Sequence, residues 1–318
     1  MSFVPCPDPE LGDAAGCAAV ETVLLPRSRD IGGMEVGRVL PSTRGQMIGP
    51  FIFFDRMGPV RFGPHQAEDV RPHPHIGLAT VTYLLDGQMI HRDSLGSEQV
   101  ITPGAVNLMT AGRGIVHSER HDAAVKAHGG SLSGVQIWLA LPQSREEGAP
   151  EFVHAGADAL PLVEDGGVSA RVILGAAFGA ASPVPLAAPA VYVDARLAPG
   201  AALPIDAEHE ERALFILDGE VEVDGTRFPA GQMLVIRNGV ATRARAHTAA
   251  RVLLLGGTAL EGPRYIWWNF VSSRLERIDE ARDAWRQGRF DLIPADHDEF
   301  IPAPGDGPGR PRAQRPRT

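Results

Sequence analysis

One pattern of residues occurs twice in this chain, and the repeat limits the folds open to it. The run "TYLLDGQMIHRD" at 82–93 matches "LFILDGEVEVDG" at 214–225, and "PGAVNLMTAG" at 103–112 matches "PAGQMLVIRNG" at 229–239. Apolar and polar residues alternate around each Asp-Gly pair, which is typical of two strands joined by a tight hairpin turn. The repeat therefore predicts two similarly built β-rich units in tandem.

Length, charge and cysteine usage exclude several classes of protein. The chain has 318 residues, enough for two domains, and no apolar run approaches the ~20 residues needed to cross a bilayer. Its net charge of −9 leaves no broad basic surface, so we expect no direct binding to nucleic acid and no membrane partner. The leading segment does not resemble a secretory signal, and its cysteines, Cys6 and Cys17, do not suggest a disulfide framework. These features favour the reducing cytoplasm.

Two short pairs of polar residues suggest a metal site in the first unit. His73 and His75 form one pair in "RPHPHIG", and His117 and Glu119 form another in "GRGIVHSER". Residues two apart point to the same side of a strand, so two strands would offer four ligands to one point. A single histidine is usually a surface or core residue, but a second pair 42 positions later, in a glycine-rich segment, argues against that interpretation.

The ligand types limit the metals and the chemistry. Three imidazoles and a carboxylate, with no thiolate, suit iron, manganese, cobalt, nickel, copper or zinc. If such an ion is six-coordinate, two positions stay open for water or substrate. The pattern therefore predicts a reactive site rather than a closed structural one.

The spacing of these residues resembles the two motifs of the cupin family. His73, His75, Thr80 and Gly87 stand at the places of the first motif, and Gly112, Gly114 and His117 at those of the second. Thr80 replaces the glutamate that cupins usually use as a ligand, and Glu119 would restore the missing carboxylate. This exchange, with the runs "HPHIGLATVTYLLDGQMIHRDSLGS", "PGAVNLMTAGRGIVHSE" and "YIWWNFVSSRLERIDEARDAWRQGRF", is similar to the pirin family. That resemblance implies a metal held by His73, His75, His117 and Glu119.

The resemblance and the repeat together predict an all-β fold of two cupin barrels (jelly-roll, or double-stranded β-helix) packed together, with a short C-terminal helix. We expect an N-terminal barrel with the metal site at 19–150, and a C-terminal barrel with the helix at 185–300. Residues 1–18 and 302–318 are expected to be loose. The repeat offsets place Ile205, Ala207, Ala244 and Ala246 at the metal positions of the second barrel, so it should hold no metal. His209, Glu210 and Glu211 lie out of register, and we expect them to be structural or solvated.

Further side chains near these motifs also have predicted roles. His91 is expected to have a structural or metal-supporting role, whereas His121 could either support a ligand or lie on the surface. Trp138 belongs in the core or over the pocket. Asp55 and Arg56 are expected to form a structural ion pair. Apolar residues at helical spacing predict an amphipathic helix from about 274 to 287, with serine as a favourable start.

The resemblance also implies a function. Pirin-like proteins are linked to the dioxygenolytic opening of flavonols such as quercetin, typically with iron, so we expect bound Fe(II) and the partners dioxygen and a small-molecule substrate. Mn, Co, Ni, Cu or Zn would also suit the ligands. Glu119 is the expected catalytic residue, acting as a general base. An alternative is an iron-dependent redox-sensing or regulatory protein that acts through a protein partner. A non-catalytic storage or scaffold cupin is a third option.

Overall fold

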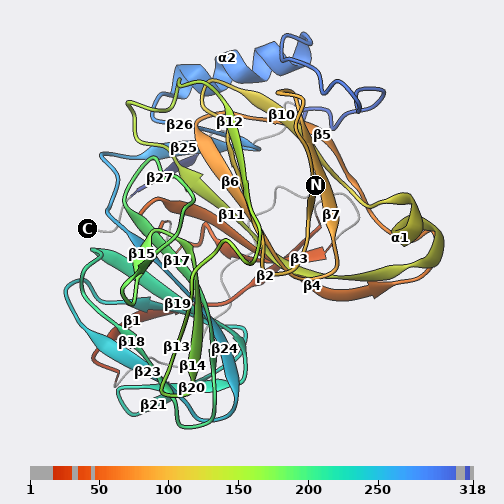
Figure 1. Ribbon diagram of the computed structural model, residues 1–318. Coiled ribbons are helices and arrows are strands. Elements are labelled where there is room, and N and C mark those ends of the chain that lie inside the picture. Colours follow the sequence, from red (N-terminus) through yellow and green to blue (C-terminus); the bar gives the residue numbers. More distant parts are fainter. Residues whose placement is uncertain (1–16, 31–34, 44–46, 306–311, 316–318) are drawn as a thin grey trace.

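The computed structural model describes residues 17–30, 35–43, 47–305 and 312–315. Two β-barrels follow each other along the chain and pack side by side, as Figure 1 shows. The helices are α1 (Ala123–His128), beside the N-terminal barrel, and α2 (Leu275–Arg286), on the far side of that barrel from the C-terminal one. The predicted fold, two cupin barrels with a C-terminal helix, is confirmed. Within the described residues, neither helix is long and apolar enough to cross a membrane.

The N-terminal barrel is built from two antiparallel sheets that face each other. The larger sheet has the strand order β12 (Glu151–Ala155), β9 (Val106–Thr110), β6 (Leu78–Asp86), β11 (Gly130–Ala140), β4 (Phe51–Phe62), β3 (Glu35–Leu40), β2 (Arg27–Asp30). The smaller sheet has the order β5 (Val70–His75), β10 (Ile115–Arg120), β7 (Met89–Asp93), β8 (Glu98–Ile101). Both sheets place alternate residues inside the barrel.

The C-terminal barrel repeats this plan. Its larger sheet has the order β1 (Val20–Leu24), β22 (Met233–Ile236), β19 (Glu211–Asp218), β24 (Ala250–Gly257), β17 (Ala190–Leu197), β14 (Val168–Leu174), β13 (Leu162–Asp165). Its smaller sheet has the order β18 (Ala202–Ile205), β23 (Thr242–Ala246), β20 (Glu220–Val223), β21 (Thr226–Pro229). Two small sheets complete the fold: β15 (Ala176–Ala177) with β16 (Ala180–Ala181), and β26 (Phe270–Ser272), β25 (Arg264–Trp267), β27 (Arg312–Gln314).

The Asp-Gly hairpins predicted from the repeat occupy equivalent places in the two barrels. Gly87 follows β6 with a φ of 80°, and Gly219 follows β19 with a φ of 79°. A side chain would be strained in this conformation, and a Cβ on Gly87 would lie 2.1 Å from the carbonyl oxygen of Ser131. Glycine is therefore required at the turn for backbone reasons.

Strand pairing crosses the expected domain limits in two places. Strand β1 pairs with β22, so the segment that precedes the first barrel in sequence is an edge strand of the second. In the other direction, the C-terminal segment returns to the first barrel, where Ile76 forms a bridge with Phe270. Ile76 and Phe270 also share an apolar cluster with Ile278 of α2. Each barrel is thus completed by a segment from the other end of the chain.

The two barrels share one apolar core between their larger sheets. Alternation along β6 sends Val81 and Tyr83 into this interface, whereas Thr82 points into the barrel, where it contacts Glu119 of the facing sheet. Phe54 packs on Phe215 across the interface, with ring centroids 4.9 Å apart. Because the shared core contains residues from both barrels, the two units bury their apolar outer faces against each other.

The helix prediction, from about 274 to 287, is confirmed, but the expected serine cap is wrong. Helix α2 begins at Leu275, and Arg274 occupies the N-cap position without a capping side-chain bond. The hydroxyl of Ser273 donates instead to Glu146, at 2.8 Å from its carboxylate. Ser273 therefore ties the helix start to the first barrel instead of capping it.

The predicted ion pair between Asp55 and Arg56 is also wrong. Asp55 accepts hydrogen bonds from Arg38 on the neighbouring strand, at 2.8 Å and 2.7 Å. Adjacent residues of a strand point to opposite faces, so a neighbour along the chain is poorly placed as a partner. The pair is structural, as expected, but it links two strands.

The predictions for the chain ends fall largely outside the described residues. Cys6 lies there, whereas Cys17 is described as a buried free thiol. In the tail that was expected to be loose, Arg312–Gln314 form β27 and pair with β25. That part of the prediction is wrong, because these residues add a third strand to the sheet of β26 and β25.

Candidate metal centre

Three histidines from two strands meet inside the N-terminal barrel. Strands β5 and β10 are antiparallel, with His117 opposite His73 and Ile115 opposite His75. The two-residue spacing puts His73 and His75 on the face that His117 also uses, so their ligand atoms all lie within 4.8 Å of one another. All three side chains are buried. The convergence expected from the sequence is thus present for the three imidazoles.

Backbone carbonyls orient two of these rings. Nδ1 of His73 lies 2.8 Å from the carbonyl oxygen of Arg71, and Nδ1 of His75 lies 3.2 Å from that of Asn269. A carbonyl can only accept, so each Nδ1 carries the proton that it donates. The Nε2 atoms of both rings therefore present lone pairs.

A side chain orients the third ring. Nδ1 of His117 lies 3.5 Å from Nδ1 of His91, and Nε2 of His91 lies 2.9 Å from a carboxylate oxygen of Asp93. The ring of His91 also stacks on Phe152, with centroids 4.3 Å apart. His91 is therefore buried between His117 and Phe152, which agrees with the structural alternative of its prediction.

The electrostatics of the cluster fit a bound cation. Burial lowers the pKa of His73 to about 4, and it holds the pKa values of His75 and His117 well below their usual range. The three rings are therefore neutral at pH 7, the form in which histidine binds metals. The Nε2 atoms of His75 and His117 lie only 3.1 Å apart. One divalent transition metal between the rings could bind both of these nitrogens.

The remaining predicted ligand, Glu119, lies outside the group of three histidines. It is buried two residues beyond His117 on β10. The pairing of β10 with β5 shifts its register between these two residues. The hydroxyl of Thr82 donates to its carboxylate at 3.5 Å. Burial raises the pKa of Glu119 to about 7, so the carboxyl is poised to bind or release a proton near neutral pH.

The other residues singled out from the sequence have distinct places. Trp138 lies in the core, as expected: it is buried and stacks on Phe53, and its ring also lies 5.3 Å from that of His75. Neither alternative for His121 is confirmed. Its side chain is buried and packs on Phe62, and its Nδ1 has no hydrogen-bond partner.

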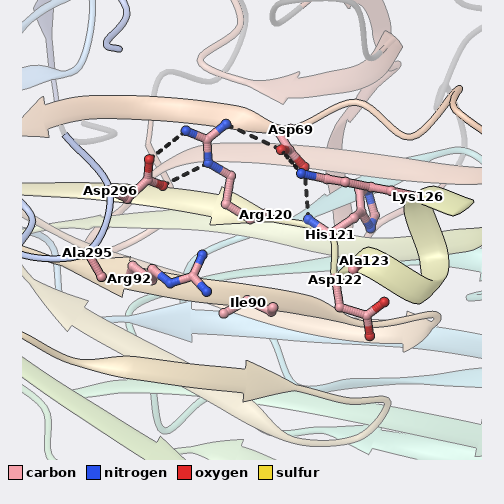
Figure 2. A pocket seen from close by; sticks show the side chains of 10 residues that line it. All are labelled: Asp69, Ile90, Arg92, Arg120, His121, Asp122, Ala123, Lys126, Ala295 and Asp296. Atoms are coloured by element: carbon pink, nitrogen blue, oxygen red, sulfur yellow. Dashed lines mark hydrogen bonds and ion pairs between the residues drawn. The ribbon is translucent and has the colours of Figure 1, made fainter. Parts of the chain in front are cut away.

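Strand β10, which carries His117, is anchored on its outer face by Asp296, a residue that the sequence analysis did not single out. Asp296 accepts a hydrogen bond from the hydroxyl of Ser118 at 2.7 Å and two from the guanidinium of Arg120, at 2.8 Å and 2.7 Å. Figure 2 shows Arg120 between Asp296 and Asp69 along the edge of a pocket of about 280 Å³. Because Ser118 and Arg120 alternate with His117 and Glu119, this contact anchors the ligand strand from behind. No local sequence signal indicates a partner so far along the chain.

A second contact ties the C-terminal segment to the other ligand strand. The backbone N–H of Ile301 donates to the carbonyl of Pro72, next to His73, at 2.8 Å. The carbonyl of Asn269 also contacts His75 on this strand, and Asp296 contacts β10, so the C-terminal segment touches both strands that carry the histidines. It therefore belongs to the structural support of the site.

The second barrel has apolar residues where the first has ligands. Leu203 lies opposite Ala244 in the pairing of β18 with β23, as His73 lies opposite His117. Ile205 and Ala244, two of the positions that the repeat offsets predicted, lie on these strands, and neither side chain can bind a metal. Leu203, Ile205 and Ala244 are buried in the apolar core of this barrel.

The polar residues around the start of β19 lie outside the metal-binding group found in the described part of the chain. Glu211 is buried and accepts a hydrogen bond from the backbone N–H of Gly49, and Glu210 is exposed. Neither these residues nor His209 belongs to the histidine group found among the described residues. Their predicted structural or solvated role is confirmed.

Comparison with known proteins relates the whole arrangement to one family. The pirin family model matches residues 33–139, and the model of the pirin C-terminal cupin domain matches residues 192–291. A pirin-like protein of Caulobacter vibrioides is 49% identical over 288 residues, which cover 90% of this chain and 99% of the relative. A Pseudomonas aeruginosa protein, provisionally named a quercetin 2,3-dioxygenase, is 38% identical over 86% of each chain. A crystal structure of quercetin 2,3-dioxygenase from Acinetobacter baumannii has a TM-score of 0.85 and 37% identity, over 92% of this chain and 98% of that one.

Proposed function

The chain belongs to the pirin family, and from this premise we propose that it is a metal-dependent dioxygenase that opens flavonols such as quercetin. The names of its relatives in Pseudomonas aeruginosa and Acinetobacter baumannii support this substrate class. The single observation that carries the proposal is the group of three buried, neutral histidines whose ligand atoms all lie within 4.8 Å of one another.

We propose that His73, His75 and His117 bind the ion and that Glu119 is the fourth ligand. When bound, the metal would supply Lewis-acid activation of a substrate hydroxyl and a redox centre for dioxygen. Three histidines and one carboxylate leave positions open for substrate at a six-coordinate ion. The indole of Trp138, beside His75, offers an apolar wall against which a flat aromatic substrate could lie.

Glu119 is suited to the proton transfer that the reaction needs. Its carboxyl is buried, its pKa is raised to about 7, and Thr82 is the hydrogen-bond partner of its Oε1. A general base works best when its pKa lies near the working pH. Glu119 would therefore take the proton of the substrate hydroxyl and leave an electron-rich enolate to react with dioxygen.

The same donor set accepts several metals, and we propose Fe(II). Cys17, the cysteine within the described residues, is a free thiol, which agrees with a reducing compartment such as the cytoplasm. Fe(II) is stable in such a compartment. Metal analysis of the protein purified without added metal, and again after anaerobic loading with Fe(II), would test this assignment.

Oxygen uptake with quercetin tests the proposed reaction. We expect oxygen consumption to accompany loss of the flavonol absorbance, and His117→Ala to abolish both. His247→Ala, which changes a half-exposed histidine of the second barrel, should retain full activity. A protein that binds Fe(II) tightly but consumes no oxygen with any of Fe, Mn, Co, Ni or Cu would contradict the proposal and favour the regulatory alternative.

A further inference from the structure

We propose that His91 and Asp93 are positioning residues that hold His117 in the tautomer and orientation needed to bind the metal through Nε2. This inference rests on the proposed metal site, but it does not depend on the identity of the substrate or on the reaction. It concerns two side chains on β7, a strand that pairs with the ligand strand β10 and contributes no proposed ligand.

The three histidine ligands differ in what fixes their Nδ1 atoms. Backbone carbonyls serve this purpose for His73 and His75, and a backbone carbonyl is present whatever the sequence. His117 is different, because its Nδ1 faces the imidazole of His91 at 3.5 Å. The orientation of His117 therefore depends on a side chain, and a single substitution can remove it.

The chain of contacts defines where each proton lies. The carboxylate of Asp93 can only accept, so Nε2 of His91, 2.9 Å away, carries the proton that it donates. The neutral His91 ring then has a lone pair on Nδ1, and this atom faces Nδ1 of His117. His117 must donate from Nδ1, which leaves its Nε2 lone pair directed toward Nε2 of His75. Carboxylates commonly act on metal-binding histidines in this way, although here a second histidine lies between them.

Further contacts hold the relay, which we define as Asp93, His91 and His117, in place. They also suggest substitutions that test it. Phe152 stacks on His91 with an interplanar angle of 11°, which fixes the plane of the ring. Asp93 uses its other oxygen, Oδ1, to accept from the backbone N–H groups of Leu95 and Ser97, at 2.9 Å and 3.1 Å. The turn after β7 and the relay therefore use different oxygens of one carboxylate.

This division suggests two substitutions that break the relay but preserve the structure. Asp93→Asn keeps an amide oxygen for the turn but puts an NH₂ group opposite Nε2 of His91, where two donors cannot pair. His91→Phe keeps an aromatic ring to stack on Phe152 but removes both nitrogens. His154→Gln is the matched control, because His154 is also a barrel histidine bonded to a side chain, Asn107 at 2.7 Å, and lies outside the ligand group.

The test measures Co(II) binding by competition with a chromophoric chelator, with the visible spectrum of the bound ion as a second readout. Loss of such supporting contacts typically weakens metal binding about 10- to 100-fold. We expect this loss in Asp93→Asn and His91→Phe, with an altered Co(II) spectrum, and unchanged binding in His154→Gln. In the metal-free wild type, ¹H–¹⁵N correlation of the imidazole rings should show the proton of His117 on Nδ1, and His91→Phe should give a mixture of tautomers.

The outcomes separate this inference from the proposed function. If both relay variants bind Co(II) within twofold of the wild type and His117 keeps its tautomer, the positioning role is wrong while the metal site stands. If the wild type itself binds no Co(II), the metal site and the relay are both wrong. Should Asp93→Asn fail to fold, His91→Phe decides alone, because it leaves the carboxylate at the turn.

Discussion

The guanidinium of Arg120 donates two hydrogen bonds to the carboxylate of Asp296, across 176 positions of the chain. Both side chains are mostly buried, and Ser118 adds a third bond to the same carboxylate. The pair connects the C-terminal segment to the strand that carries His117. It gives that segment a direct effect on the metal site, even though the segment provides no proposed ligand.

We expect Asp296→Asn to destabilise the protein by about 2 kcal/mol, because it leaves the buried guanidinium of Arg120 short of a charged partner. Urea unfolding of the metal-free protein would measure this. Glu299→Gln is the matched control, since Glu299 also bonds Arg120 but its side chain is 50% exposed. The control should lower stability by no more than about 0.5 kcal/mol. Equal effects of the two substitutions would contradict the anchoring role.

The same carboxylate should shape the response to acid. Burial acts to raise the pKa of Asp296, but hydrogen bonds from Arg120 and Ser118 outweigh it, and the pKa lies below its ordinary value of 3.8. A carboxyl with a lowered folded-state pKa stabilises the protein above pH 3.8, and this stabilisation is lost as the pH falls through the folded-state pKa. The stability difference between wild type and Asp296→Asn should therefore be full at pH 6 and shrink below pH 4. A difference that stays constant from pH 6 to pH 3 would be inconsistent with this titration.

Removing the metal should lower the stability of the wild type. A ligand that binds only the folded state adds about 2.7 kcal/mol when its free concentration is 100 times its Kd. Thermal unfolding with and without a chelator should show this shift in the wild type and no shift in His117→Ala. We expect one metal per chain, because apolar residues occupy the equivalent positions of the second barrel. Two equivalents of tightly bound metal would refute that expectation.

Glu119→Gln should distinguish the catalytic role of Glu119 from its effect on the stability of the protein. In the metal-free protein, burial raises the pKa of Glu119 from 4.5 to about 7, so stability falls as the pH rises between these values and the buried charge costs about 3 kcal/mol at pH 8. The neutral glutamine avoids this cost, and metal-free Glu119→Gln should be more stable than the wild type at pH 8 but not at pH 4. Its turnover of quercetin, followed by oxygen uptake with metal in excess, should fall at least about 100-fold. Undiminished turnover would remove Glu119 from the mechanism.

Patterns in the sequence predicted two similar β-rich units, the C-terminal helix and the convergence of three histidines, and the family resemblance identified the two units as cupin barrels. The reason is that a strand has a fixed period of two, so the spacing of His73 and His75 already specifies a common face. The Asp-Gly turns at Gly87 and Gly219 mark the same hairpin in both barrels, because few other residues tolerate their backbone conformation. These features depend on residues that are close together along the chain.

Only the tertiary structure decided which distant residues support the site. The relay from Asp93 through His91 to His117 requires β7 to lie beside β10, and the contact of Asp296 with Arg120 requires the C-terminal segment to return to the first barrel. Likewise, the register shift beyond His117 puts Glu119 near Thr82. Such contacts depend on strand order, register and the packing of separate segments, and one residue of register changes which side chains meet. No local period in the sequence encodes that information, which is why the candidate ligands could be named from the sequence, whereas Asp93 and Asp296 could not.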